Sequence, residues 1–378
     1  MTYIFLAMIV SFGVTLAAIR LQRPSAHAHA ARSESSSESK MHGLNRAGGI
    51  GVAAGLLISL LARLFAEAPY AIASAHMGLT LLVAVLPIFA AGLLEDFTQR
   101  IGIWARLLAA LASALLAGWM LGAWIPRFDF APLDAVIAFP LVSALLTCVL
   151  VAGVTHAFNI IDGFNGLAGG VAALILLGIA YVAFKAGDIA VLAAALTAVG
   201  AIAGFMLLNF PRGLIYLGDG GAYLLGFWIG VLLVMLIARN PDVSAWFPVL
   251  LCSYPVCELL FSIYRRVVIR RAHPGLPDVA HLHHLIYMRL VRWLVGSSLP
   301  EPKSQRNALT APYLWIVTSI GVVPSVVFWQ SPLALQIGCL LFAATYVYCY
   351  VRIAKFRAPR WWVLRKPHER RSSAPETR

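Results

Sequence analysis

The chain has 378 residues, of which 61% are hydrophobic and only 12% are charged, and its formal net charge is +13. A soluble domain carries about 25% charged residues, so this composition excludes a water-soluble globular protein and indicates a membrane protein. The positive charge does not indicate nucleic-acid binding, because no base-reading module accompanies it.

The sequence contains eleven apolar segments that approach or exceed the length needed to cross a bilayer, about 20 residues of helix. Alternating strands of the barrel type are not found in the sequence, so helices are the expected spanning elements. We therefore predict an all-α fold, a polytopic membrane helical bundle of about 11 transmembrane helices. In chain order the segments are Tyr3–Leu21, Gly48–Phe65, Gly78–Leu94, Trp104–Ile125, Ala135–Ala157, Leu167–Phe184, Ile189–Leu208, Gly220–Ala238, Ala245–Val268, Pro312–Phe328 and Leu333–Val351.

The first segment sets the expected topology. No basic residue precedes its apolar run, and Arg20 and Arg23 lie at and after its end, which favours a retained helix over a cleaved signal peptide. With eleven helices, the odd-numbered loops and the C-terminal tail carry all but four of the 29 Lys and Arg residues. The positive-inside rule then predicts that this side is cytoplasmic and that the N-terminus lies outside. The four basic residues on the other side are Arg63, Arg127, Lys185 and Arg239.

The sequence predicts one membrane domain, residues 1–351, followed by a basic cytoplasmic tail, residues 352–378, that faces lipid headgroups. Two cytoplasmic segments interrupt the domain. Residues 25–40 are a low-complexity insertion, in which His27 and His29 favour a solvated loop over a metal site. Residues 265–311 form a loop rich in His and Arg. The five cysteines fall in apolar segments without metal-ligand spacing, which favours a role as small buried hydrophobes.

Two polar clusters lie in the first hundred residues. Lys40 and His42, with Arg46 close behind, precede the second apolar segment, and such groups bind phosphate oxygens. The alternative is a basic loop at the membrane edge. Glu95 and Asp96 are adjacent acids at the end of the third segment, where a magnesium ion bound to substrate phosphates would relieve their repulsion. Capping of the next helix is the alternative for this pair.

A third cluster occupies His156–Gly170, between two apolar segments. Asn159 and Asp162 are three residues apart, so one helical face can present both. Asparagine can bind the edge of a base or a sugar, and aspartate can bind a metal or a proton. The alternative is that Asp162 and Asn165 cap the following helix.

The fourth cluster joins Asn209 to Asp219, which lies in a glycine-rich turn before the eighth segment. Free N–H groups at a helix N-terminus favour phosphate, and an acid there can bind magnesium. An N-cap role for Asp219 is an equal alternative.

The fifth cluster contains Arg265 and, after a basic run, His281, His283 and His284. The surrounding positive charge disfavours zinc, so imidazoles that donate to phosphates are the better interpretation. Glu258 lies within the ninth segment, where an ion pair with an arginine at the helix end is favoured.

Together these clusters resemble the polyprenyl-phosphate N-acetylhexosamine-1-phosphate transferase family, bacterial glycosyltransferase family 4, whose members start O-antigen, enterobacterial common antigen and wall teichoic acid synthesis. Asn159-Ile160-Ile161-Asp162-Gly163 looks like its Asn-x-x-Asp-Gly motif, and Leu217-Gly218-Asp219 looks like its Met-Gly-Asp motif. His281-Leu282-His283-His284 matches its His-x-His-His motif. The related phospho-MurNAc-pentapeptide translocase has three consecutive histidines instead.

The resemblance implies transfer of a sugar-1-phosphate from a UDP-sugar to undecaprenyl phosphate, with release of UMP. It implies Mg²⁺ as the cofactor, with Mn²⁺ as an alternative ion, and a multi-pass protein of the bacterial inner membrane with a periplasmic N-terminus and a cytoplasmic active site. The expected partners are undecaprenyl phosphate, the UDP-sugar and membrane lipids, with no nucleic acid, and a homodimer is left open.

The resemblance also implies roles for individual residues. Asp219 is the expected metal ligand, and Asp96 is the expected base or orienting carboxylate, a role that Asp162 can exchange with it. The expected catalytic residues are Glu95, Asp96, Asp162, His281, His283 and His284. The expected substrate-binding residues are Lys40, His42, Asn159, Asn165, Asn209 and Arg265.

The chain departs from the family pattern at Glu95 and Asn165, where aspartate is usual, and at Val279, where arginine is common. These departures leave the identity of the transferred sugar open. The main alternative function is a transporter or flippase, although transporter charges gather near the membrane midplane and these lie at helix ends. A CDP-alcohol phosphotransferase is disfavoured, because the Ala-Arg and further aspartates expected after Asp162-Gly163 are missing from the sequence.

Overall fold

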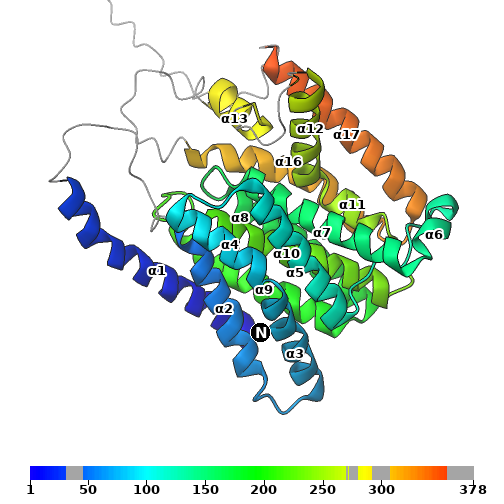
Figure 1. Ribbon diagram of the computed structural model, residues 1–378, viewed down its shortest axis with the longest axis horizontal. Helices are drawn as coiled ribbons and strands as arrows, with labels where there is room; N and C mark the ends of the chain where they lie inside the picture. The colour runs from blue at the N-terminus through cyan, green and yellow to red at the C-terminus, as the bar shows by residue number, and fades with distance from the viewer. Residues whose placement is uncertain (31–45, 270, 272–279, 292–306, 356–378) are drawn as a thin grey trace, which may run out of the picture.

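A computed structural model describes residues 1–30, 46–269, 271, 280–291 and 307–355. The regular secondary structure among these residues is helical, and the helices form a bundle (Figure 1). The helices through the first half are α1 (Thr2–Ala30), α2 (Gly48–Arg63), α3 (Pro69–Ala84), α4 (Leu86–Thr98), α5 (Ile103–Leu121), α6 (Ala131–Ile137), α7 (Pro140–Ile161) and α8 (Leu167–Ala186). The others are α9 (Ile189–Asn209), α10 (Gly218–Arg239), α11 (Phe247–Leu251), α12 (Ser253–Tyr264), η2 (Arg265–Ile269), α13 (Leu282–Ile286), η3 (Tyr287–Val291), α16 (Thr310–Val327) and α17 (Pro332–Ala354).

The prediction of an all-helical, polytopic membrane bundle is confirmed, but the number of full spans is smaller than eleven. Among the described residues, eight helices are long and apolar enough to cross a membrane, and a bent pair brings the number to nine. The two remaining predicted segments are also helical. Gly48–Phe65 is the shorter helix α2, and Ala245–Val268 is divided among α11, α12 and η2.

The bent pair, α3 and α4, explains one of these differences. The predicted segment Gly78–Leu94 crosses a break at Val85 where the two helices meet at 50°. Pro87, at the second position of α4, has no N–H and cannot continue the hydrogen bonding of α3. The N–H of Ile88 donates instead to Ser113 Oγ of α5 at 3.1 Å. Hydropathy does not detect this bend, because both arms are apolar.

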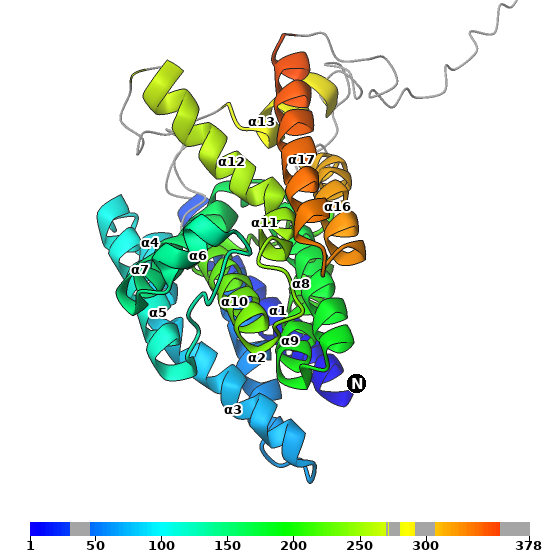
Figure 2. The same cartoon turned by 90° about the vertical axis from the view of Figure 1, so that its right-hand side faces the viewer.

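The core of the bundle is α10, which is buried at nearly every position from Gly218 to Ile237. It packs against α2, α4, α7 and α8 (Figure 1). A helix with water on one side has a single apolar face, whereas a helix surrounded by other helices can be apolar on all sides. Figure 2 shows α12 and α17 extending beyond the main bundle, with α13 between them. The elements α12, α13 and α17 therefore lie at the same end of the molecule.

Glycine pairs bring three helices close together at this end. A Cβ on Gly49 of α2 would overlap Gly221 of α10, and a Cβ on Gly92 of α4 would lie 2.6 Å from Gly220. Small residues allow such close approach of helices in membranes. The contact places the last turn of α4 directly against the first turn of α10.

Candidate active site

The carboxylate cluster, Asp96, Asp162 and Asp219, lies where the end of α4, the end of α7 and the start of α10 meet. Asp96 is only 1% exposed. Its two carboxylate oxygens accept the N–H groups of Asp219, at 2.9 Å, and Gly220, at 3.0 Å. The sequence had predicted that free N–H groups at this helix start bind phosphate. Two of them donate instead to Asp96, which suits the positive end of the helix dipole.

The turn before α10 requires glycine. Gly218 has a φ of +79°, and a Cβ there would meet the backbone oxygen of Arg46 and lie 2.7 Å from Asp96 Oδ2. The side chain of Arg46 reaches Asp96 Oδ1 at 4.0 Å. The same turn is tied to the start of α2, because the N–H of Gly49 donates to the carbonyl of Leu217 at 2.8 Å. The backbone around the carboxylate cluster is thus fixed by tight contacts.

Asp219, the predicted metal ligand, pairs with Arg106 of α5 at 2.9 Å, and both side chains are largely buried. Sequence reasoning missed Arg106. It is the only charged residue of Ile103–Leu121, and a lone charge inside an apolar helix is a functional signal. The other neighbours come from α10 and α7. Tyr223 donates to Asn159 Oδ1 at 3.3 Å, and the His156 ring lies edge-on to Tyr223 at 5.3 Å.

Asp162 caps the end of α7, outside the apolar span. Burial, followed by the charges of Asp219 and Asp96, raises the pKa of its carboxyl to about 8. This mutual repulsion is the condition that a divalent cation relieves, and oxygen ligands are those that Mg²⁺ prefers. No group of three or more metal-binding side chains closes around one point in the described part of the chain. The carboxylate cluster therefore fits an ion that also takes ligands from substrate phosphates and water, as Mg²⁺ commonly does.

The histidine cluster, His281, His283 and His284, lies at the start of α13. The rings of His281 and His283 are stacked at 5.2 Å, and those of His283 and His284 are 4.4 Å apart. Burial and the neighbouring positive groups hold the pKa of His283 well below its usual value. His283 is therefore neutral and can donate one ring N–H.

Glu258 of α12 orients this cluster. Its Oε2 contacts His281 Nδ1 at 3.1 Å, and its Oε1 accepts the N–H of Leu282 at 2.9 Å. Glu258 is completely buried. The sequence had favoured an arginine as its partner, and the structure shows that His281, which is 23 positions away in the chain, fills this role.

The loop between α7 and α8 connects the two clusters. A Cβ on Gly163 would lie 3.8 Å from His283 Nε2, and the Phe164 ring lies 5.5 Å from the rings of both His283 and His284. Asp162 is the residue before this contact. The structure therefore brings the predicted residues of α4, α7, α10 and α13 to one end of the bundle.

Two predicted substrate-binding residues support the loop from behind. Asn209 Oδ1 accepts the N–H of Gly166 at 2.6 Å, and its amide donates to the carbonyl of Ile215 at 2.7 Å. Asn165 is completely buried and donates to the carbonyl of Pro211 at 3.3 Å. These contacts give both residues a structural role in shaping the turn. Substrate contact by either one stays a prediction.

Two further predicted residues, Glu95 and Arg265, make contacts within the protein at this end. Glu95 Oε2 accepts the N–H of Ile101 at 2.8 Å, which anchors the turn after α4. Arg265 is buried, with its guanidinium over the rings of Phe261 and Tyr350. Lys40 and His42 lie outside the described residues.

Comparison with known proteins gives matches over part of the chain. Residues 78–237 match the model of glycosyl transferase family 4. The chain is 31% identical to a probable undecaprenyl-phosphate N-acetylglucosaminyl 1-phosphate transferase of Bacillus subtilis, over 37% of this chain and 39% of that protein. It is 25% identical to the undecaprenyl-phosphate alpha-N-acetylglucosaminyl 1-phosphate transferase of Thermotoga maritima, over 55% and 61%. For the protein of that name in Escherichia coli the identity is 26%, over 63% and 64%. The matches thus span between about two fifths and two thirds of these relatives.

Proposed function

We propose that this chain, whose residues 78–237 match the model of glycosyl transferase family 4, transfers a sugar-1-phosphate, an N-acetylhexosamine-1-phosphate, from a UDP-sugar to undecaprenyl phosphate. The products are the lipid-linked sugar diphosphate, which would start a cell-envelope glycan such as O-antigen, and UMP. One observation carries the proposal. The carboxylate cluster and the histidine cluster lie on either side of the α7–α8 loop, with Gly163 against His283. Such a site offers groups for a metal and for phosphates side by side.

In the proposed reaction an oxygen of the acceptor phosphate attacks the sugar-linked phosphorus of the donor. The bond from that phosphorus to the bridging oxygen breaks, and UMP leaves with the bridging oxygen. Both reactants are anions, so catalysis depends on alignment and on neutralising charge. Mg²⁺ bound at Asp219 would supply the positive charge for the diphosphate, and Mn²⁺ is the alternative ion.

The contacts favour Asp162 over Asp96 as the proton acceptor. Both oxygens of Asp96 already accept backbone N–H groups of α10, which suits an orienting role. Asp162 has a pKa raised to about 8, and a base with a pKa near the working pH is the most effective. Asp162 therefore takes the acceptor proton, where one is present, and Asp96 fixes the start of α10.

The histidine cluster is assigned to the phosphates of the donor. A neutral His283 donates an N–H without the desolvation cost of a buried cation. Glu258 fixes the ring of His281 from behind, at 3.1 Å. Arg106 gives a further positive group beside Asp219, at 2.9 Å. Asn159, whose Oδ1 accepts from Tyr223, is positioned to contact the nucleotide.

The orientation proposed for the protein puts both clusters at the cytoplasmic face. Arg63, Arg127 and Arg239 lie at or near helix ends remote from the clusters. In the described part of the chain, Arg46 and Arg106 contact the carboxylate cluster and Arg265 lies near His283, so the positive-inside rule favours a cytoplasmic location for that end.

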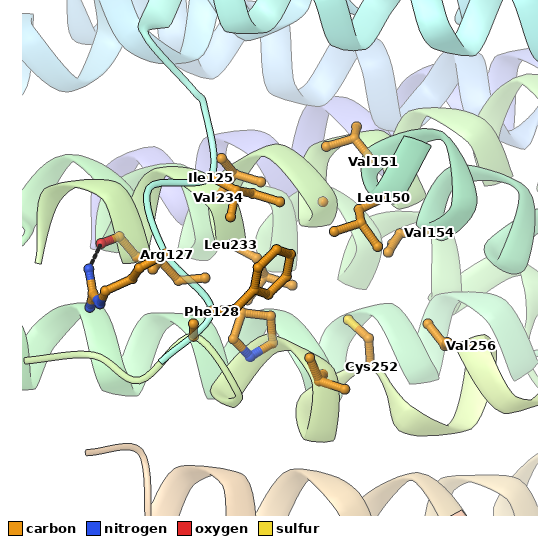
Figure 3. Close-up of a pocket in the computed structure, with 15 residues that line it drawn as sticks. Ile125, Arg127, Phe128, Leu150, Val151, Val154, Leu233, Val234, Cys252 and Val256 are labelled. Carbon is orange, nitrogen blue, oxygen red and sulfur yellow. Dashed lines mark hydrogen bonds between the residues drawn. The ribbon is translucent and has the colours of Figure 1, made fainter. Parts of the chain in front are cut away.

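An apolar cavity on the flank supports a lipid acceptor. Figure 3 shows it between Val151 and Val154 of α7, Leu233 of α10, and Val256 of α12, two residues before Glu258. Val154 is eight residues before Asp162, which corresponds to about 12 Å along a helix. We assign the cavity to part of the prenyl tail, because its wall is apolar and begins within two to three helical turns of the carboxylate cluster.

A donor screen tests this function. Purified protein, undecaprenyl phosphate and Mg²⁺ are mixed with a panel of UDP-sugars, and UMP release and the lipid product are measured. We expect one UDP-N-acetylhexosamine to give UMP in equal amount to the lipid-linked sugar diphosphate, and EDTA to stop the reaction. A transporter or flippase would instead move a labelled substrate across vesicles without releasing UMP, and that result would refute the proposal.

A further inference from the structure

Arg63 is a buried cation at the end of the bundle remote from the two clusters. It is the last residue of α2, whose first residues contact the turn before α10. The 16 residues of α2 put these two ends about 24 Å apart. Only 7% of Arg63 is exposed. Its environment is therefore protein, and its charge needs a partner there.

The partners of Arg63 are all neutral. Its two terminal nitrogens donate to Ser74 Oγ and Thr197 Oγ1, each at 3.2 Å, and its guanidinium lies 4.8 Å from the centre of the Tyr3 ring. Each hydroxyl already donates its hydrogen to a carbonyl one helical turn earlier, so only lone pairs face the arginine. Arg63 Nε is buried and has no hydrogen-bond partner. No carboxylate of the described residues pairs with this guanidinium.

Two other arginines at this end, Arg127 and Arg239, have carboxylate partners. Arg127 pairs with Asp129 at 3.0 Å and donates to four carbonyls, one of them that of Ile237 (Figure 3). Arg239 pairs with Asp188 at 3.0 Å. Both are more exposed than Arg63, yet each has a carboxylate. Of these three arginines, Arg63 is thus the most deeply buried and the one whose charge has no carboxylate partner among the described residues.

A cavity of about 580 Å³ opens beside Arg63. Its polar wall includes Arg63 and Ser74, and its apolar wall includes Ile4, Leu192 and Leu196. Tyr3 and Tyr70 also line it, and tyrosines are enriched at the membrane–water interface. The neighbouring face of α1 exposes Phe5 and Ile9, which are suited to lipid contact. The cavity is therefore amphipathic and lies next to the bilayer.

We propose that this cavity binds a membrane phospholipid, with the headgroup phosphate on Arg63 and an acyl chain along the apolar wall. The phosphate supplies the negative charge and the acceptor oxygens that Arg63 lacks. Glu67 also lines the cavity, is exposed, and forms no ion pair with Arg63. One cation and one acid among the lining residues of the cavity fit the zwitterionic headgroup of phosphatidylethanolamine. This lipid site is separate from the site of sugar-phosphate transfer.

Thermal unfolding of the purified, delipidated protein tests the proposal. Phosphatidylethanolamine should raise the apparent melting temperature by about 3 °C or more, as expected for a ligand of the folded state. Diacylglycerol with the same acyl chains, which lacks the phosphate, should not. Arg63→Gln should abolish the shift, whereas Arg239→Gln, at the same end but with its own carboxylate, should retain it.

A second variant keeps the test valid if Arg63→Gln fails to fold. Ala193→Phe fills the cavity from α9 and leaves Arg63 in place, and it should also abolish the shift. A lipid shift that survives in either variant would overturn the proposal, as would an equal shift with diacylglycerol. An Arg63-dependent shift with inorganic phosphate alone, and none added by the lipid, would identify a soluble anion and overturn the lipid assignment.

Discussion

The carboxylate cluster and the histidine cluster use opposite charges but respond to burial in the same way. In the first, burial and neighbouring acids raise the pKa of Asp162 to about 8. In the second, burial and neighbouring cations lower the pKa of His283. Both shifts favour the neutral form. Each cluster is therefore short of one charge, a cation on the carboxylate side and an anion on the histidine side.

The clusters also differ in how they are supported. The carboxylate cluster sits on the ends of long helices that are packed through glycine contacts, Gly92 with Gly220 and Gly49 with Gly221. The histidine cluster sits on the five-residue helix α13 and depends on Glu258 for its position. A metal bound to a diphosphate carries both missing charges. The proposed ligand thus completes the two clusters together.

The largest effect is expected on the carboxylate side. Asp219→Ala removes the proposed metal ligand and should lower UMP release by about 10³-fold, comparable to the loss of a principal electrostatic group in an active site. Asp242→Ala, which removes an exposed aspartate just beyond the far end of α10, should keep normal turnover. Turnover near the wild-type rate in Asp219→Ala would remove Asp219 from the metal site.

On the histidine side the expected loss is smaller, because Glu258 acts through another residue. Glu258→Ala and His281→Ala should each lower kcat/KM by about 10- to 100-fold, the range seen when a carboxylate that orients a functional histidine is lost. The double variant should be no slower than the slower single variant, because the two residues act as a unit. Glu258→Gln, which still accepts from Leu282, should recover part of the activity. Losses that multiply in the double variant would show that the residues act independently.

Arg106 is expected to compete with the metal ion for Asp219, because its guanidinium pairs with that carboxylate at 2.9 Å. In Arg106→Gln the metal no longer has to displace an arginine from Asp219. The Mg²⁺ concentration that gives half of the maximal thermal stabilisation should therefore fall by about tenfold, which corresponds to the free energy of one charged hydrogen bond. The kcat of this variant should fall at the same time if Arg106 also contacts phosphate. Arg100→Gln, on the exposed turn between α4 and α5, is the control. An unchanged or higher Mg²⁺ requirement in Arg106→Gln would mean that arginine and metal do not compete.

The sequence predicts features that depend on neighbouring residues better than features that depend on contacts between distant segments. Every predicted apolar segment contains helix, because hydropathy is a local property. The break before Pro87 was missed, although proline is a local signal, because its neighbours are apolar on both sides. The polar clusters were found because glycines and acids at segment ends are visible in the sequence. Their mutual placement became visible only in the fold.

Features that depend on pairing between distant segments were beyond sequence reasoning. Glu258 was assigned an arginine in its own segment, whereas its contact is His281 on α13. The sequence predicts Asn209 at the substrate, which stays a prediction, but it gives no sign that the amide of Asn209 bridges Gly166 and Ile215. Arg106 was not selected at all, although it is the lone charge of its helix. Each case concerns a polar group whose partner is determined by helix packing.

The smallest effect concerns stability and tests the missing charge directly. The pKa of Asp162 is raised from 3.8 to about 8 in the folded protein. Ionisation of Asp162 therefore destabilises the folded protein. This destabilisation is absent below pH 4, grows between pH 4 and 8, and is complete above pH 8. Asp162→Asn removes it, so in EDTA the variant should melt at nearly the wild-type temperature at pH 4 and roughly 3 °C or more higher at pH 9.

Asp242→Asn, an exposed site, should show no such trend. Mg²⁺ at pH 9 should narrow the difference, because a cation stabilises the charged carboxylate of the wild type and has no charge to act on in the variant. A difference that is largest at pH 4 and vanishes at pH 9 would mean that the fold stabilises the carboxylate rather than the acid. That result would refute the claim that the carboxylate cluster lacks a cation.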